Sequence, residues 1–117
     1  MLPREHRLRR SGDFARVRRE GRAWSHPWLV VTAAPNGGTV SRVGFTVSKR
    51  VGRAHVRNLV RRRLREAVRA CLPELALGYD VVIISRPALA DQSFTALCAV
   101  LAQQLRHARL LTRAGAS

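Results

Sequence analysis

Residues 49–69 read KRVGRAHVRNLVRRRLREAVR, and this stretch decides how the chain is expected to fold. It holds nine Lys and Arg side chains and a single acidic one, Glu66. Apolar residues recur within it at spacings of three and four, which predicts an amphipathic helix over residues 55–71 whose apolar side packs against a sheet or another helix. That side comprises Val56, Leu59, Val60, Leu64, Ala67, Val68 and Cys71.

The opposite side of this predicted helix is a polar stripe. It gathers Arg57, Asn58, Arg61, Arg62, Arg65 and Arg69 when successive residues are placed about 100° apart. A solvated surface helix usually mixes charges of opposite sign at i and i+4, and here only Glu66 has that option. A disordered basic tail would need no apolar side. We therefore predict a docked helix whose arginines face nucleic-acid phosphates, with a membrane or acidic-protein surface as the remaining alternative.

The whole chain is strongly basic. Its 117 residues carry 22 Lys and Arg against 7 Asp and Glu, a formal net charge of +15, and 46% of them are apolar. This size and composition predict one domain over residues 1–117 with a modest core and with flexible termini at 1–10 and 112–117. So much charge binds polyanions in any context, so it indicates a class of partner and no particular function.

The sequence gives little support for a metal site, an oxidising compartment or a membrane location. Cys71 and Cys98 lie at apolar positions without zinc-ligand spacing, which predicts buried free thiols in a reducing compartment. The four histidines are scattered, so we expect no metal held by protein ligands alone. The first residues lack an apolar targeting segment, and no stretch approaches the ~18 apolar residues of a membrane span. We expect a cytoplasmic protein with no membrane partner.

Turn and strand signals surround the helix. Pro35 to Gly38 is a strong turn signal, so strands predicted over 28–34 and 42–48 should form an antiparallel hairpin. A continuous apolar run from Val81 to Ile84 predicts a strand over 79–85 that is buried on both faces or central in its sheet.

Two further helices complete the pattern. The first is predicted from Ser11 to about Gly21, and the last begins near Asp91 or Ser93. A short additional strand at 22–25 is possible. The order α-β-β-α-β-α, with that optional strand, predicts an α+β two-layer sandwich.

The basic helix and its flanks resemble the bacterial ribonuclease P protein component. The central segment matches the family's signature as Lys49-Arg50-x-Gly52-x-Ala54-x-x-Arg57-Asn58-x-x-Arg61-Arg62-x-x-Arg65-Glu66. Further pieces follow the family's order upstream, namely Arg7-Leu8, Asp13-Phe14, Val17, Gly21-Arg22 and the strand VGFTVS at 43–48. The resemblance covers roughly residues 7–86, and a chance basic helix would not bring these flanks with it.

The resemblance implies a fold, a function and partners. The fold is the α+β sandwich, similar to a ribosomal protein domain, with an unusual left-handed β-α-β crossover through the basic helix. Family members bind a catalytic RNA, and the ribonucleoprotein removes the 5′ leader from precursor tRNA. The chemistry is expected on the RNA and its Mg²⁺ ions, with no catalytic residue on this chain and no obligate protein partner.

The resemblance also implies two sets of site residues by position. The RNA-binding set is Lys49, Arg50, Arg53, Arg57, Asn58, Arg61, Arg62 and Arg65. A cleft for the single-stranded leader would hold Phe14, Val17 and Arg18, where an aromatic ring stacks on unpaired bases. The spacing of Phe14 and Val17 fits simple helix packing equally well, so both roles stay open for Phe14.

Two positions depart from the family's pattern. Leu59 stands where a third basic residue is common, and the helical phase points Leu59 toward the apolar side. Arg18 stands where a second aromatic residue is common, which favours weaker stacking and stronger phosphate attraction. His55 lies in a variable part of the motif and is expected to contact RNA or to begin the helix.

Two rival functions remain. A nuclease acting alone needs a histidine pair, a carboxylate cluster or an activated nucleophile. The acidic residues are dispersed, and the one tyrosine, Tyr79, begins a predicted buried strand, so this rival is disfavoured. A small ribosomal-type RNA-binding protein without a catalytic partner fits the composition well. It would not predict the cleft beside Phe14.

Overall fold

The computed structural model describes residues 2–111; Met1 and the predicted flexible tail 112–117 lie outside the described residues. The order of helices and strands is the predicted one, and the optional strand is present as β1. The elements are α1 (Ser11–Glu20), β1 (Arg22–Ser25), β2 (Leu29–Pro35), β3 (Arg42–Val47), α2 (Ala54–Cys71), β4 (Tyr79–Ser85) and α3 (Phe94–His107), with short 3-10 turns η1 (Arg4–His6), η2 (Lys49–Val51), η3 (Leu72–Glu74) and η4 (Pro87–Asp91).

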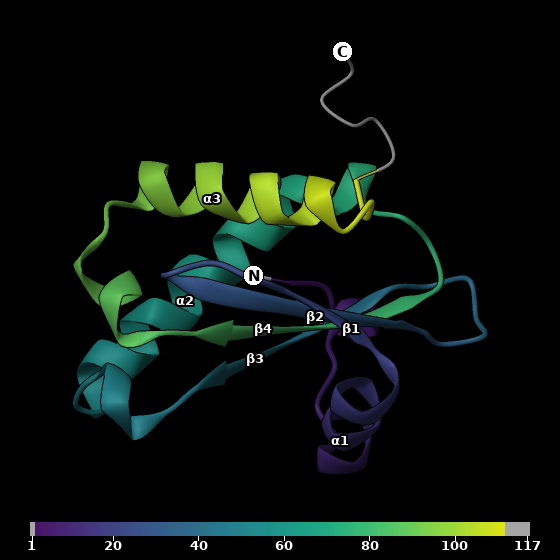
Figure 1. Ribbon diagram of the computed structural model, residues 1–117, viewed down its shortest axis with the longest axis horizontal. Helices are drawn as coiled ribbons and strands as arrows, with labels where there is room; N and C mark the ends of the chain where they lie inside the picture. The colour runs from purple at the N-terminus through teal and green to yellow at the C-terminus, as the bar shows by residue number, and fades with distance from the viewer. Residues whose placement is uncertain (1, 112–117) are drawn as a thin grey trace.

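The strands form one mixed sheet in the order β1-β2-β4-β3. β2 pairs antiparallel with both β1 and β4, whereas β3 and β4 are parallel neighbours. Because parallel neighbours need a crossover, the chain passes from β3 to β4 through α2. α2 and α3 cover one face of the sheet and α1 covers part of the other (Figure 1). The α+β sandwich is as predicted, and α1 adds a partial layer to the expected two.

β4 is a central strand buried on both faces, as its apolar run predicted. Val81 and Ile83 point into the large core beneath α2 and α3, and Val82 belongs to a small cluster under α1. A strand whose two faces are both covered by helices carries a continuous run of apolar residues, because neither face is exposed to water.

The predicted hairpin between β2 and β3 is wrong. β4 lies between the two strands, so they run in opposite directions without pairing. The segment after β2 still turns, with Gly38 N–H bonded to Asn36 Oδ1 at 2.8 Å. Asn36 N–H is bonded at 2.8 Å to the carbonyl of Gly78, which precedes β4. A turn signal is local, whereas burial of the β4 run on both faces demands the central place in the sheet.

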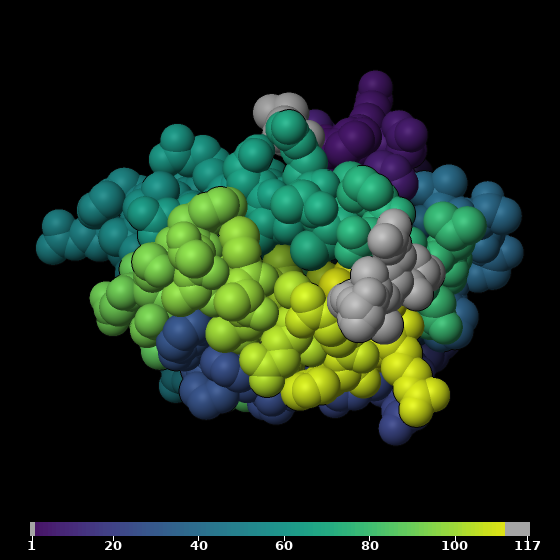
Figure 2. Space-filling view, turned by 90° about the horizontal axis from the view of Figure 1, so that it is seen from above, coloured from purple at the N-terminus to yellow at the C-terminus, as the bar shows by residue number. Residues whose placement is uncertain are grey.

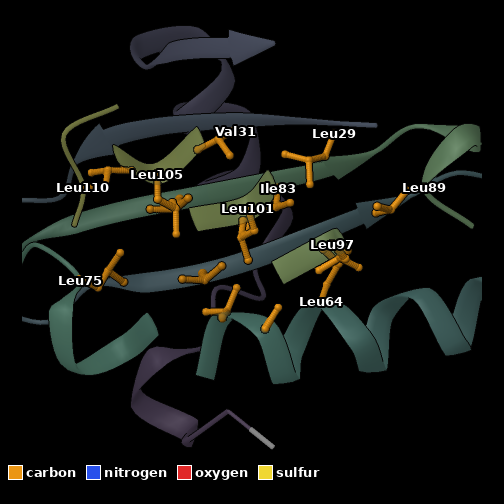
Figure 3. Packing of buried hydrophobic residues seen from close by; sticks show 14 of the residues in the cluster. Leu29, Val31, Leu64, Leu75, Ile83, Leu89, Leu97, Leu101, Leu105 and Leu110 are labelled. Carbon is orange, nitrogen blue, oxygen red and sulfur yellow. The ribbon is translucent and has the colours of Figure 1, made fainter. Parts of the chain in front are cut away.

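The large core fills the space between the sheet and the two covering helices (Figure 3). Leu64 of α2 and Leu97 and Leu101 of α3 are fully buried there. α3 begins at its predicted cap, because Ser93 Oγ accepts a hydrogen bond of 3.1 Å from Ala96 N–H. Figure 2 looks onto this side of the molecule, where α2 and α3 lie next to each other with α2 along one margin.

Residues 2–10, part of the terminus predicted to be flexible, contact the sheet at several points. Leu2 and Leu8 are buried, and Leu8 N–H donates a 3.0 Å hydrogen bond to the carbonyl of Val43 on β3. Arg7 and Val43 form an isolated parallel bridge. These contacts cover part of β3, which is otherwise an exposed edge of the sheet. In the described part of the chain, no helix is long and apolar enough to span a membrane.

Candidate nucleic-acid interface

A tight glycine turn sets the start of α2. Gly52 has a φ of 153°, a conformation that side chains disfavour, and an added Cβ would lie 3.0 Å from Val56. Val51 is buried and anchors the turn, while Lys49, Arg50 and Arg53 around it are exposed. The basic residues predicted at the beginning of the helix therefore project from a fixed turn.

The arginines of α2 face away from the core as predicted. Arg62 and Asn58 are exposed, and Arg57, Arg61 and Arg65 are partly buried along their stems. Arg57 Nε donates a 3.1 Å hydrogen bond to the Gly52 carbonyl, and Arg61 donates one of 3.1 Å to Asn58 Oδ1.

These guanidinium groups keep their positive charge available. Within residues 2–111, Arg57, Arg61, Arg62 and Arg65 form no ion pair with a carboxylate, whereas Arg69 lies 3.7 Å from Glu66. Unpaired cations on a braced helix are suited to phosphate contacts.

Leu59 does not point to the apolar side, contrary to the sequence-based expectation. Its exposed fraction is 37%, and it lines a shallow depression of about 390 Å³ with Phe94, whose exposed fraction is 42%. Arg62, Arg63 and Glu66 complete that depression. The apolar side of a helix is narrower than a wheel projection suggests, because α3 covers only one flank of α2.

The structure joins the two predicted sites in one cleft. A cavity of about 430 Å³ lies at the edge strand β3, and it brings Phe14 of α1 together with Arg61 and Arg65 of α2. Both were expected to contact RNA, but nothing in the sequence placed them in one cavity. The full lining is Leu2, Arg7, Leu8, Arg9, Phe14, Val43, Gly44, Phe45, Arg61 and Arg65.

A glycine of β3 makes room for the aromatic ring of the cleft. Gly44 lies beneath Phe14, and a Cβ on Gly44 would overlap the end of that ring and approach the Leu8 carbonyl oxygen to 2.9 Å. The ring is half-buried and packs against the cluster of Leu8, Val17 and Val82. Phe14 therefore serves as packing and as cleft wall at once.

The other two predicted cleft residues do not line the cavity. Val17 has an exposed fraction of 0% and is enclosed under α1, so its position reflects helix packing. Arg18 is exposed on α1 but is not part of the lining.

Three charged or aromatic lining residues were missed as site residues. Arg7, Arg9 and Phe45 reach the cleft because the N-terminal segment crosses the edge of β3. Arg7 and Phe45 did occur in the pieces that carried the family resemblance, which was the available signal. Their role depends on a contact between residues far apart in the chain.

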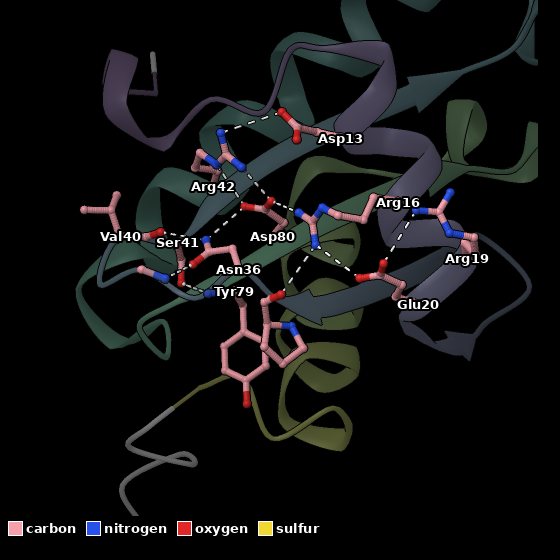
Figure 4. Close-up of polar contacts among 12 residues, drawn as sticks. Asp13, Arg16, Arg19, Glu20, Asn36, Val40, Ser41, Arg42, Tyr79 and Asp80 are labelled. Atoms are coloured by element: carbon pink, nitrogen blue, oxygen red, sulfur yellow. Dashed lines mark hydrogen bonds and ion pairs between the residues drawn. The ribbon is translucent and has the colours of Figure 1, made fainter.

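A buried carboxylate lies outside the cleft lining. Asp80 of β4 has an exposed fraction of 0% and receives hydrogen bonds from three elements (Figure 4). Arg42 of β3 donates from Nε to Oδ1 at 2.9 Å and from Nη2 to Oδ2 at 2.7 Å. Asn36 donates to Oδ1 at 3.0 Å, and Arg16 of α1 pairs closely with Oδ2. Arg42 also lies 3.7 Å from the carboxylate of Asp13 on α1.

The pairing outweighs the cost of burying this charge. Burial alone would raise the pKa of Asp80, but hydrogen bonds from Arg42 and Asn36 and the charges of Arg42 and Arg16 hold that pKa below its usual range. The hydrogen bond to Asp80 in turn raises the pKa of Arg42. Asp80 is therefore ionised and fully paired at neutral pH.

Metal-ligating side chains are scattered over the part of the chain that the structure describes. Across the described residues, no group of three or more His, Cys, Asp or Glu side chains could hold a metal ion. Cys71 and Cys98 are free and half-buried, and burial raises the pKa of both thiols. His55 is exposed at the start of α2.

Comparison with known proteins identifies the family. A family model described as Ribonuclease P matches residues 2–109. The chain belongs to this family. A ribonuclease P protein component from Roseiflexus castenholzii is 49% identical over 115 residues, which cover 97% of this chain and 89% of the relative. One from Chloroflexus aurantiacus is 50% identical over 111 residues, covering 94% of this chain and 82% of the relative.

Solved structures of ribonuclease P proteins have the same fold. The protein from Staphylococcus aureus superposes with a TM-score of 0.84 at 26% identity, covering 91% of this chain and 97% of the other. The protein from Thermotoga maritima gives 0.75 at 30% identity, covering 92% and 96%. The four-stranded mixed sheet with three helices is thus the ribonuclease P protein fold.

Proposed function

We propose that this chain is the protein subunit of ribonuclease P, which binds the catalytic RNA and holds the 5′ leader of precursor tRNA while that leader is removed. One observation carries the proposal: Arg61 and Arg65 of α2 and the ring of Phe14 line a common cleft. Such a cleft offers phosphate contacts and a stacking surface to the same single strand.

The proposal assigns separate roles to two surfaces. Lys49, Arg50 and Arg53 around the Gly52 turn, with the outward arginines of α2, neutralise phosphates of folded RNA. The cleft takes a single-stranded segment, because its aromatic rings stack on bases without sequence preference. Arg61 and Arg65 belong to both surfaces, so they adjoin RNA and leader together.

The proposal assigns the chemistry to the RNA. Hydrolysis of a phosphodiester with Mg²⁺ requires carboxylate or phosphate oxygens as ligands. The described residues do not fit such a site, since they provide no cluster of acidic side chains that could hold a metal ion. We therefore derive no catalytic step from this chain and propose that the Mg²⁺ ions are held mainly by the RNA, in the cytoplasm where precursor tRNA is processed.

A ribosomal-type RNA-binding protein without a catalytic partner is the weaker alternative. It accounts for the basic helix but gives no reason for a half-buried aromatic ring beside Arg61 and Arg65. It also predicts no effect of this protein on cleavage of precursor tRNA.

Reconstitution with the catalytic RNA tests the proposal. Cleavage of precursor tRNA at low Mg²⁺ should rise when the protein is added, and the holoenzyme should bind precursor tRNA more tightly than mature tRNA. Unchanged cleavage on addition of the protein would contradict the proposal. Activity without the protein should depend more steeply on salt than activity with it.

Two variants separate the surfaces. Combined replacement of Arg57, Arg61 and Arg65 by Ala should weaken assembly and reduce the slope of log affinity against log salt by about 2 to 3, at ~0.7–0.9 per phosphate contact. Its control replaces three exposed arginines that lie outside α2 and the cleft lining, Arg19, Arg86 and Arg106, which removes the same charge.

Phe14→Ala addresses the cleft. It should weaken binding of precursor tRNA by about 1–3 kcal/mol while binding of mature tRNA stays the same. An equal loss for leader-containing and leaderless tRNA would remove the leader role of the cleft.

A further inference from the structure

Phe14 is held from both sides along α1. Asp13, the residue before it, lies 3.7 Å from Arg42, and Arg16, two residues after it, pairs with Asp80. Arg42 is also bound to Asp80 through two hydrogen bonds. Asp13 and Arg16 are therefore both linked to Asp80, Asp13 through Arg42 and Arg16 directly (Figure 4).

The same carboxylate fixes the opposite wall of the cleft. Arg42 is the first residue of β3, and Val43, Gly44 and Phe45 follow it in the lining. Since Asp80 lies on the neighbouring strand β4 in register with Arg42, it holds the beginning of β3 and the middle of α1 at a set separation. Asn36 donates to the remaining side of Oδ1 and anchors the turn that leads toward β3.

Apolar contacts alone fix α1 weakly. Val17 is its only fully buried side chain in the structure described here, and the cluster around it comprises Leu8, Val82 and two partly buried neighbours. A helix with so small a buried surface can shift or roll on the sheet at low cost. Directional charged hydrogen bonds are what give it one position.

We propose that Asp80 is a positioning residue for leader recognition: by binding Arg16 and Arg42 it clamps α1 to β3 and sets the place of the Phe14 ring over Gly44. Asp80 is enclosed and touches no RNA in this arrangement, so it acts through Phe14. The leader part of this inference rests on the proposed function.

Two substitutions open the clamp with opposite changes of net charge. Asp80→Asn removes a negative charge, whereas Arg16→Gln removes a positive charge and leaves Asp80 bound to Arg42 and Asn36. If simple attraction to RNA decided leader affinity, these two variants would shift it in opposite directions. The clamp predicts a loss for both.

Matched controls exist for each change. Asp91→Asn makes the same chemical change at the exposed last residue of η4, and Arg19→Gln does so on α1 itself, three residues beyond Arg16. Neither residue reaches the cleft lining. Arg16→Gln also guards against failure of Asp80→Asn to fold, because it leaves the buried carboxylate paired.

The first measurement is amide hydrogen exchange in the full-length free protein. Opening the clamp should lower protection of the α1 amides by about tenfold or more, as loss of a charged hydrogen bond implies, while amides of α2 and α3 keep theirs. Unchanged α1 protection in both variants would overturn the clamp. Equal loss throughout the sheet and all helices would also overturn it, since Asp80 would then be a general stability residue.

The second measurement is the ratio of affinities of the reconstituted holoenzyme for precursor and mature tRNA. Both variants should lower this ratio about three- to tenfold, part of what stacking on Phe14 supplies, and the controls should not. In the Phe14→Ala background the same substitutions should have no further effect, because residues that act through one contact are not additive. Full additivity with Phe14→Ala would overturn positioning through that ring.

The two measurements keep the inference and the proposed function apart. If the unmodified holoenzyme does not distinguish precursor from mature tRNA, the proposed leader role fails, and the exchange experiment still decides whether Asp80 clamps α1. If it does distinguish them and α1 loosens without any change in the ratio, positioning for leader recognition is overturned while the proposed function stands.

Discussion

The two faces of the sheet hold their helices by different means. On one face, α2 and α3 enclose a continuous hydrophobic core that includes Leu64, Leu97 and Leu101. On the other, α1 buries Val17 and is tied to the sheet by ion pairs at Asp80. The helix that carries the RNA-binding arginines, α2, is thus held by a broad apolar contact. The helix that carries Phe14, α1, is held mainly by ion pairs.

This difference matches what each surface is proposed to bind. Folded RNA presents a fixed array of phosphates. A helix that is already held in one position loses little conformational entropy when it binds such an array. A single-stranded leader varies in sequence, and an aromatic ring that directional contacts hold in one place can stack on any base, because every base has a π-face. The comparison leads to four predictions about stability, ordered by the expected effect.

The largest effect is expected on the α2 and α3 face. Leu64→Ala should lower the free energy of unfolding by about 2–5 kcal/mol, because it removes buried methyl groups and leaves a cavity in a core that cannot collapse fully. Denaturant unfolding measures this. Leu77→Ala, at a residue with an exposed fraction of 73%, is the control and should stay within about 0.5 kcal/mol of the parent.

A smaller loss is expected beneath α1. Val17→Ala removes two methyl groups from a small cluster, which corresponds to about 1.5–2 kcal/mol at ~0.8 kcal/mol per group. The same unfolding measurement applies. If Val17→Ala costs as much as Leu64→Ala, the two faces do not differ in the way described.

The cap of α3 contributes less still. Ser93→Ala removes the oxygen that accepts from Ala96 N–H and should cost about 1 kcal/mol. Ser93→Asp retains an acceptor and should cost little. Amide hydrogen exchange should show lower protection at the first turn of α3 and unchanged protection in α1. Lower protection in α1 as well would show that the two faces of the sheet are coupled.

The last prediction concerns a loss of stability that develops only in acid. The pKa of Asp80 is depressed in the folded state, so its contribution to stability is present above the unfolded value of about 3.9 and is lost as pH falls through the folded value. Below about pH 4, the free energy of unfolding of the parent should therefore fall more steeply than that of Asp80→Asn. Parallel curves over this range would show that the buried carboxylate titrates normally.

Much of the fold could be predicted from local patterns. The bounds of α2 and β4 follow from a helical apolar period and a continuous apolar run, and helix, strand and turn signals along the chain predicted the order of the elements. The pairing of β2 with β3 was wrong, because turn residues specify a change of direction and not the neighbouring strand.

The site was predicted less completely. The outward arginines were found because charge and helical phase lie in one segment. Leu59 was misplaced because the helix period does not show how far α3 reaches over α2. Arg9 and Phe45 were missed as site residues because they become lining only when the N-terminal segment crosses β3.

By itself, the sequence determined a basic amphipathic helix, a strand buried on both faces and membership of a family, because each follows from residue types at fixed spacing along the chain. Only the tertiary structure decided that β4 separates β2 from β3, that Phe14 shares a cleft with Arg61 and Arg65, and that Asp80 joins α1 to β3. The physical reason is that these relations depend on which distant surfaces bury one another, and burial is a property of the whole packed chain.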